Sequence, residues 1–137
     1  MEVCERLCIF APRCKYDLQV ITENTMDVPR FGIMLLDDAR VFLKSLDMET
    51  KQEIAADLKA ATLTVNSNLF KKLQGTEIWE FRSKVNGLQY RLLAFWDKNR
   101  KSLVVATHAF VKKTQKTPLQ EIKRAEKIMK KYYNQNI

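Results

Sequence analysis

Two alternating runs joined by Asn-Gly constrain the fold of this chain more than any other feature. The runs Glu77–Lys84 (EIWEFRSK) and Leu88–Trp96 (LQYRLLAFW) have a hydrophobic period of two, and Asn86-Gly87 lies between them. Asn-Gly is strongly favoured in two-residue hairpin turns, because both turn positions require a positive φ. The sequence therefore predicts a β-hairpin in which Val85 faces Leu88 and the pairing continues outward from the turn.

Between Pro29 and this hairpin the apolar residues recur at helical spacing. They form two groups on either side of a short break near residues 46–48, which predicts two antiparallel helices. Asp47 is a favourable N-cap for the second helix. The expected apolar faces are Leu35, Leu36, Ala39, Phe42, Leu43 and Leu46 in the first helix, and Ile54, Ala55, Leu58, Ala61 and Val65 in the second.

Further strands and a last helix complete the expected order. Lys15–Thr22 alternates and predicts a first strand, and Leu103–Phe110 predicts a third strand beside the hairpin. Thr117-Pro118 with Gln120 predicts a capping box that begins a final helix ending near Tyr133. The residues expected to be buried in that helix are Leu119, Ile122, Ala125, Met129 and Tyr132.

The order β-α-α-β-β-β-α predicts one α+β domain over residues 1–137, with helices packed on an antiparallel sheet. Residues 1–14 are either an extra N-terminal arm or the product of an upstream start codon. Their three cysteines, Cys4, Cys8 and Cys14, match no zinc or iron–sulfur spacing. Free thiols in a reducing cytoplasm are therefore the favoured interpretation.

Composition excludes several classes of function. A single His rules out a multi-histidine metal site and a paired-histidine nuclease, and three Gly rule out a glycine-rich phosphate loop. No apolar run approaches the ~20 residues that a membrane-spanning helix needs. We therefore expect a cytoplasmic protein with no cofactor and no metal.

Positive charge is concentrated in the second half of the chain. Residues 1–68 hold 8 Lys and Arg against 11 Asp and Glu, whereas residues 69–137 hold 16 against 5. Phosphate polymers are the commonest partners of so basic a segment, and an ordinary basic surface is the alternative.

The hairpin register places two arginines together. Arg82 lies directly opposite Arg91, and Glu80 projects from the same face of the sheet, diagonal to Arg91. Like charges directly opposed on a sheet are destabilising by up to ~1 kcal/mol, so either the carboxylate offsets them or the pair binds a phosphate. The alternative is a solvated trio. The residues expected on the opposite, packed face are Trp79, Phe81, Tyr90, Leu92 and Ala94.

A second basic group follows the third strand. Lys112, Lys113 and Lys116 lie between the end of that strand and the start of the last helix, whose N-terminus attracts anions. The alternative is a solvated loop. His108 lies on the same strand, where a structural role is commoner than a catalytic one, although its ordinary pKa suits proton transfer.

Four blocks in this order and spacing resemble the RelE/ParE toxin superfamily, and are most similar to its HigB-like branch of phage-derived toxins. The blocks are Phe70–Gly75 (FKKLQG), Ile78–Arg82 (IWEFR), Tyr90–Leu93 (YRLL) and His108–Pro118 (HAFVKKTQKTP). The resemblance covers residues 66–133 well and residues 15–65 only in the order of elements.

This resemblance implies a type II toxin that cleaves mRNA, usually on the ribosome, without a metal. It also implies a helix-turn-helix, HigA-like antitoxin as partner. By motif position, Arg91 corresponds to the phosphate-binding arginine of the family, and Lys113 or Lys112 to the basic residue that closes the last strand. Ile78 and Glu80 stand where RelE-type sequences carry lysines, and no tyrosine follows near residues 117–119, so the acid–base roles of the family do not transfer.

From these observations we expect an endoribonuclease site that works mainly by electrostatic stabilisation of the reacting phosphate. Two other functions on the same fold stay open, a ParE-like inhibitor of DNA gyrase and a non-catalytic nucleic-acid-binding module. The expected catalytic residues are Arg91, Arg82, Glu80 (as the base) and Lys113, and the expected RNA-binding residues are Lys71, Lys72, Lys112, Lys116 and His108.

Overall fold

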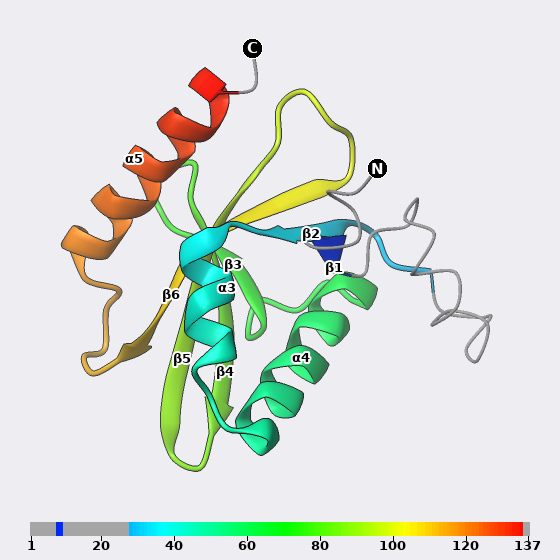
Figure 1. The fold of residues 1–137 in the computed structure, drawn as a ribbon, viewed down its shortest axis with the longest axis vertical. Helices are drawn as coiled ribbons and strands as arrows, with labels where there is room; N and C mark the ends of the chain where they lie inside the picture. The colour runs from blue at the N-terminus through cyan, green and yellow to red at the C-terminus, as the bar shows by residue number, and fades with distance from the viewer. Residues whose placement is uncertain (1–7, 10–27, 136–137) are drawn as a thin grey trace.

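The computed structural model describes residues 8–9 and 28–135. It contains a six-stranded sheet in the order β1-β2-β6-β5-β4-β3, with α3 and α4 against one face and α5 against the other (Figure 1). The elements are β1 (Cys8–Ile9), β2 (Gly32–Leu35), α3 (Asp37–Lys44), α4 (Met48–Leu63), β3 (Phe70–Lys72), β4 (Trp79–Val85), β5 (Leu88–Trp96), β6 (Leu103–Lys112) and α5 (Leu119–Gln135).

The α+β class is confirmed, but the sheet is mixed rather than wholly antiparallel. β2 and β6 run parallel, and every other neighbouring pair is antiparallel. β2 also includes Leu35, which helical spacing had assigned to the first helix. Most of the apolar run that ends at Leu36 becomes a strand, Gly32–Leu35, buried along its whole length. Periodicity alone does not distinguish such a strand from a buried helix segment. The strand expected over Lys15–Thr22 lies outside the described residues.

The predicted hairpin forms with the expected register. Val85 pairs with Leu88, and the turn residues Asn86 and Gly87 have φ values of 51° and 79°. β6 continues to Lys112, beyond the predicted end at Phe110. The short edge strand β3 was not predicted, because its three residues are too few to show a period.

Helix boundaries follow the predicted signals in part. Asp47 caps α4 by accepting a hydrogen bond from the backbone N–H of Thr50 at 3.3 Å. Val65 lies beyond the end of α4 and is exposed, and Leu119 is exposed at the first turn of α5, so neither joins the core as expected. Both are too near a helix end to be covered by a neighbouring element.

Two apolar clusters hold the layers together. The face expected to pack, which includes Phe81 and Leu92, is buried beneath α3 and α4. The opposite face carries Leu93, Phe95 and Val105 beneath α5. Burial on both sides fixes the sheet as the central layer. Among the described residues, no helix combines the length and the apolar character that crossing a membrane requires.

Candidate functional site

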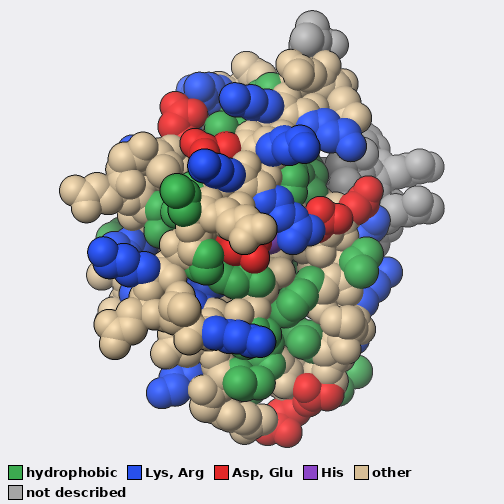
Figure 2. All heavy atoms as spheres, turned by 90° about the vertical axis from the view of Figure 1, so that its left-hand side faces the viewer, with side chains coloured by type: hydrophobic (Ala, Val, Ile, Leu, Met, Phe, Trp, Pro, Cys, Tyr) green, Lys and Arg blue, Asp and Glu red, His purple; other side chains and the backbone are tan. Residues whose placement is uncertain are grey.

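The sheet face beneath α5 changes from apolar to charged along its strands. Where the helix covers it, the face carries Leu93 and Phe95. Towards the β4–β5 turn, the same face carries Glu80, Arg82 and Arg91. Figure 2 views the molecule from the side where β5, β6 and α5 lie in Figure 1, and Lys and Arg side chains outnumber Asp and Glu there. A charged site therefore lies at one end of this face.

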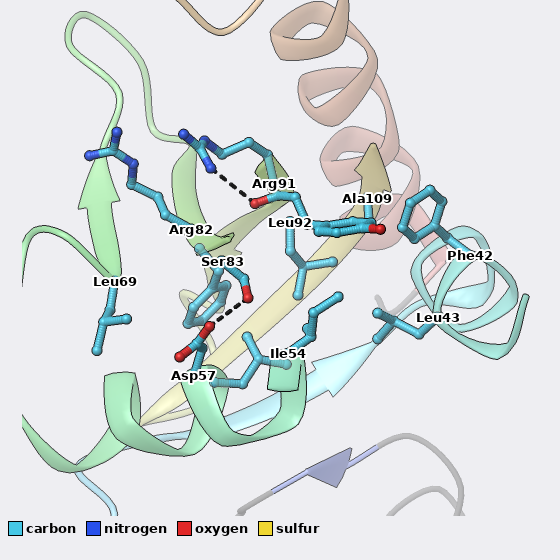
Figure 3. Close-up of a pocket in the computed structure, with 13 residues that line it drawn as sticks. Phe42, Leu43, Ile54, Asp57, Leu69, Arg82, Ser83, Arg91, Leu92 and Ala109 are labelled. Atoms are coloured by element: carbon cyan, nitrogen blue, oxygen red, sulfur yellow. Dashed lines mark hydrogen bonds between the residues drawn. The ribbon is translucent and has the colours of Figure 1, made fainter. Parts of the chain in front are cut away.

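The two arginines lie together as the sequence predicts. Arg82 pairs directly with Arg91, and both guanidiniums project to the same side of the sheet, away from Ser83 and α4 (Figure 3). The Oε1 atom of Glu80 lies 3.7 Å from Nε of Arg82 and 3.4 Å from Nε of Arg91. The predicted register and the reach of Glu80 are both confirmed.

The trio is largely buried, so the solvated alternative is wrong. Glu80 and Arg91 are each 3% exposed, whereas the side chain of Arg82 is 33% exposed. Arg91 donates to Oε1 of Gln89 at 2.7 Å and to the carbonyl oxygen of Tyr90 at 3.1 Å. Within the described residues its Nε atom has no hydrogen-bond partner, although it lies beside Glu80. Arg91 is therefore held in one orientation, and Arg82 stays accessible.

Thr117 connects the trio to the lysine-rich loop. Its hydroxyl donates to Oε2 of Glu80, so both carboxylate oxygens are engaged. The capping-box prediction is therefore wrong, because this side chain is used for a contact across the fold. α5 begins at Leu119, and the carbonyl oxygen of the preceding Pro118 accepts from the N–H groups of Glu121 and Ile122.

Sequence reasoning missed the roles of Thr117 and Gln89. Gln89 pairs with Lys84 on the arginine side of the hairpin, so the predicted register contains the signal that identifies it. Thr117 has no such signal, because a threonine just before a helix is most simply interpreted as its cap.

Two lysines complete the site. Lys112 pairs with Gln89 across β5 and β6, and Lys71 pairs with Glu80 across β3 and β4. Burial and the positive charges of Arg91, Arg82 and Lys71 lower the pKa of Lys112, while Glu80 opposes the shift. Burial, with a contribution from Arg82, likewise lowers the pKa of Arg91. We call Lys71, Arg82, Arg91 and Lys112, around Glu80, the basic cluster.

Other predicted site residues lie elsewhere. Lys72 pairs with Trp79, so it belongs to the opposite face, and Lys113 and Lys116 are exposed in the loop after β6. His108 is only 1% exposed, so the structure places it in the interior rather than on a surface that RNA reaches.

The buried imidazole of His108 bridges β6 and α5. Its Nε2 atom lies 3.0 Å from the carboxylate of Glu121, and its Nδ1 atom 3.0 Å from the hydroxyl of Thr107. Burial lowers the pKa of His108, and the hydrogen bond to Glu121 opposes that shift. The Thr107 hydroxyl also donates to the carbonyl oxygen of Leu93 at 3.1 Å, so this network joins β5 to β6 and α5.

Comparison with known proteins gives one family. The model of the family described as phage derived protein Gp49-like (DUF891) matches residues 41–130, which include the whole basic cluster. This chain belongs to the Gp49-like family. Membership confirms the predicted resemblance to phage-derived proteins of this kind. The assignment to the HigB-like branch stays a prediction.

Solved structures include chains that are similar to the Gp49-like protein in fold. For example, this protein is similar to a chain of the intact E. coli RelBE toxin–antitoxin complex, with a TM-score of 0.46 and 16% sequence identity over 62% of this chain and 99% of that chain. None of the curated proteins matches it in sequence. In the part of the chain that the structure describes, no group of three or more His, Cys, Asp or Glu is placed to hold a metal ion.

Proposed function

We propose that this Gp49-like protein is the toxin of a type II toxin–antitoxin system and cleaves mRNA as a metal-independent endoribonuclease. The basic cluster carries the proposal, because four cations surround one buried carboxylate at the open end of the sheet face. Cations so close together repel one another, and a bound phosphate offsets that repulsion. The resemblance of residues 70–118 to the RelE/ParE superfamily supports the same activity.

RNA cleavage through the 2′-hydroxyl requires three steps at one phosphate. The hydroxyl loses its proton, the phosphorane formed by in-line attack is stabilised, and the 5′-oxygen of the leaving group gains a proton. We assign stabilisation of the phosphorane to Arg82 and Arg91, which lie opposite each other on one face of the sheet. Electrostatic stabilisation by preoriented groups is usually the largest contribution to catalysis. We assign proton exchange to Lys112, which borders the arginine pair and whose pKa is lowered by burial and by the neighbouring cations.

Glu80 suits a positioning role better than the role of general base suggested by the sequence. Its Oε1 atom contacts both arginines, its Oε2 atom accepts from Thr117, and its side chain is 4% exposed. A base must come within ~2.6–3.2 Å of the proton that it removes. We therefore assign Glu80 to holding the two guanidiniums on one side of the sheet.

The exposed lysines extend the site along the RNA. Lys113 and Lys116 lie outside the basic cluster but close to it in the chain, on the loop that Thr117 ties to Glu80. Such flanking cations attract a polyanion before specific contacts form. In this proposal the message is bound on the ribosome, and an acidic segment of a helix-turn-helix antitoxin covers the same surface.

The proposal is tested by expressing the protein in a bacterial host without a partner. We expect growth arrest and internal cuts in translated messages, with DNA supercoiling unchanged. Arg91→Lys keeps the buried charge but loses the planar fork, so cutting should fall by ~100- to 1,000-fold. Arg100→Ala, an exposed arginine in the β5–β6 turn, is the matched control and should cut like the wild type.

Three outcomes contradict this proposal. Arrest with altered DNA topology and intact messages indicates a gyrase inhibitor. No arrest and no cutting indicates a non-catalytic binding module. Equal cutting by the Arg91→Lys variant and the wild type shows that the basic cluster is not the site of catalysis.

A further inference from the structure

An open cleft lies beside the basic cluster, along the edge of β4. β3 pairs with β4 only over Trp79–Phe81, with one more backbone hydrogen bond from the N–H of Arg82 to the carbonyl oxygen of Leu69. Beyond that point the edge of β4 faces the start of β3 and the side of α4. The resulting cleft has a volume of about 420 Å³, within the ~300–1,000 Å³ of ligand sites.

The arginines face both the cleft and the cluster. Arg82 and Arg91 line the cleft, and the same two side chains meet Glu80 in the basic cluster. A phosphate held by these guanidiniums therefore lies at the mouth of the cleft. The part of an RNA chain adjacent to a bound phosphate is a nucleoside, so its base has a space to enter.

Apart from Lys84 and Ser83, the remaining walls suit a base rather than a second phosphate. Asp57 contributes a carboxylate, which repels phosphate oxygens but accepts hydrogen bonds from the amino groups of bases. Asn68 contributes an amide that both donates and accepts, and Leu69 contributes an apolar surface. Gln89 lines the arginine side of the cleft, where its Oε1 atom accepts from Arg91. The Arg82 guanidinium offers a flat surface on which a base stacks.

Asp57 is held in place from β4. The hydroxyl of Ser83 donates to Oδ2 of Asp57 at 2.5 Å, as Figure 3 shows, which joins α4 to the strand. A fixed carboxylate discriminates between bases more sharply than a mobile one, because its acceptor atoms need no reordering. Cytosine presents an amino group where uracil presents a carbonyl oxygen, so these two pyrimidines differ at the group that a carboxylate reads.

We propose that this cleft is a nucleobase subsite, in which Asp57 and Asn68 select a base with an exocyclic amino group over uracil. The inference rests on the proposed function for the RNA-binding role of the basic cluster, and it adds the residues that give sequence preference. It also assigns a division of labour, with phosphate bound by the arginines and base identity read beside them.

Binding of two matched RNA probes tests the subsite without requiring cleavage. Short oligocytidylate and oligouridylate of equal length are titrated by fluorescence anisotropy at one fixed salt concentration. The wild type should bind oligocytidylate at least ~5-fold more tightly, the lower limit for one good side-chain–base pair. Asp57→Asn replaces an acceptor oxygen by a donor amide while its other oxygen still accepts from Ser83, so the ratio should fall towards one.

Two further variants complete the experiment. Asn68→Ala should also lower the ratio, and it protects the test if Asp57→Asn folds poorly, because the Asn68 side chain is exposed. Asn134→Ala, an exposed asparagine on α5, should leave the ratio at the wild-type value. Equal affinity of the wild type for both probes overturns the subsite, as does an unchanged ratio in both cleft variants.

Mapping the cut sites distinguishes failure of the subsite from failure of the proposed function. Cut sites mapped in host messages should show uracil disfavoured at one position next to the cut, and this bias should weaken in Asp57→Asn. Cutting without any such bias leaves the nuclease standing and overturns the subsite. A wild type that prefers oligocytidylate but cuts no message removes the nuclease and retains a base-selective RNA-binding cleft.

Discussion

Replacing Glu80 by glutamine should destabilise the fold strongly, although the two side chains have nearly the same size. Oε1 of Glu80 lies 3.4 Å from Nε of Arg91, and both side chains are at most 4% exposed. At an effective dielectric constant of about 20, two unit charges at this distance attract by about 5 kcal/mol. Part of that attraction offsets the desolvation of the two ions.

What remains after the substitution is a buried guanidinium without its counter-charge. Removing one partner of a buried pair typically lowers the free energy of unfolding by about 3–5 kcal/mol. The neutral amide of glutamine still accepts from Thr117, so we expect a value near 3 kcal/mol. Urea denaturation followed by the fluorescence of Trp79 and Trp96, the two tryptophans of the chain, measures it directly.

A matched substitution in an exposed ion pair separates the effect of burial from the effect of removing a negative charge. Glu77 forms an ion pair with Lys98 at 3.5 Å, but the two side chains are 60% and 66% exposed. Glu77→Gln should therefore change the free energy of unfolding by no more than about 1 kcal/mol. Equal effects of the two substitutions would refute the reasoning, because they would show that water screens the Glu80–Arg91 pair as well.

Three other predictions concern the same network. Burial lowers the pKa of His108, so the free energy of unfolding should be highest above the ordinary histidine pKa of about 6.5. It should decrease as the pH falls below that value, by at most ~1.4 kcal/mol per pH unit. His108→Gln should flatten this pH dependence in urea titrations. Thr117→Val should lower the free energy of unfolding by roughly 1.5–3 kcal/mol through loss of a hydrogen bond to a charged group, and an effect no larger than that of exposed Thr114→Val would contradict this. Lys112→Ala should reduce the dependence of log RNA affinity on log salt by ~0.7, whereas Lys127→Ala should leave it unchanged.

The hairpin was predictable down to individual residues because one turn fixes its register. Once Asn86-Gly87 is placed, the pairing of Arg82 with Arg91 and the reach of Glu80 follow from alternation alone. The alternation of residues along the strands does not predict that Glu80 and Arg91 are buried. Coverage of Glu80 by Thr117 depends on how the lysine-rich loop returns to the sheet, which is a tertiary property.

Other features were out of reach for related reasons. β2 was not predicted, and its last residue, Leu35, was assigned to the first helix, because a short apolar run has no distinguishing period. Its parallel pairing with β6 joins segments distant in sequence. The sequence predicts a catalytic Lys113 and an RNA-binding Lys112, and only the pairing of Lys112 with Gln89 shows which of these adjacent lysines lies in the basic cluster. The cleft depends on Asp57 of α4 meeting Ser83 of β4, and no local motif links those two elements.

The parallel pairing of β2 with β6 also determines when the molecule is completed during synthesis. β2 cannot pair with β6 until the chain has been synthesised beyond Leu103, the partner of Gly32. α3 and α4 pack on the same strands, so they also have no complete sheet to cover before that point. Contacts between such distant segments form slowly, because a long stretch of chain must be brought together first. The basic cluster needs Lys112, and Thr117 closes over Glu80 later still. A nascent chain therefore has no assembled site until nearly all of it has left the ribosome.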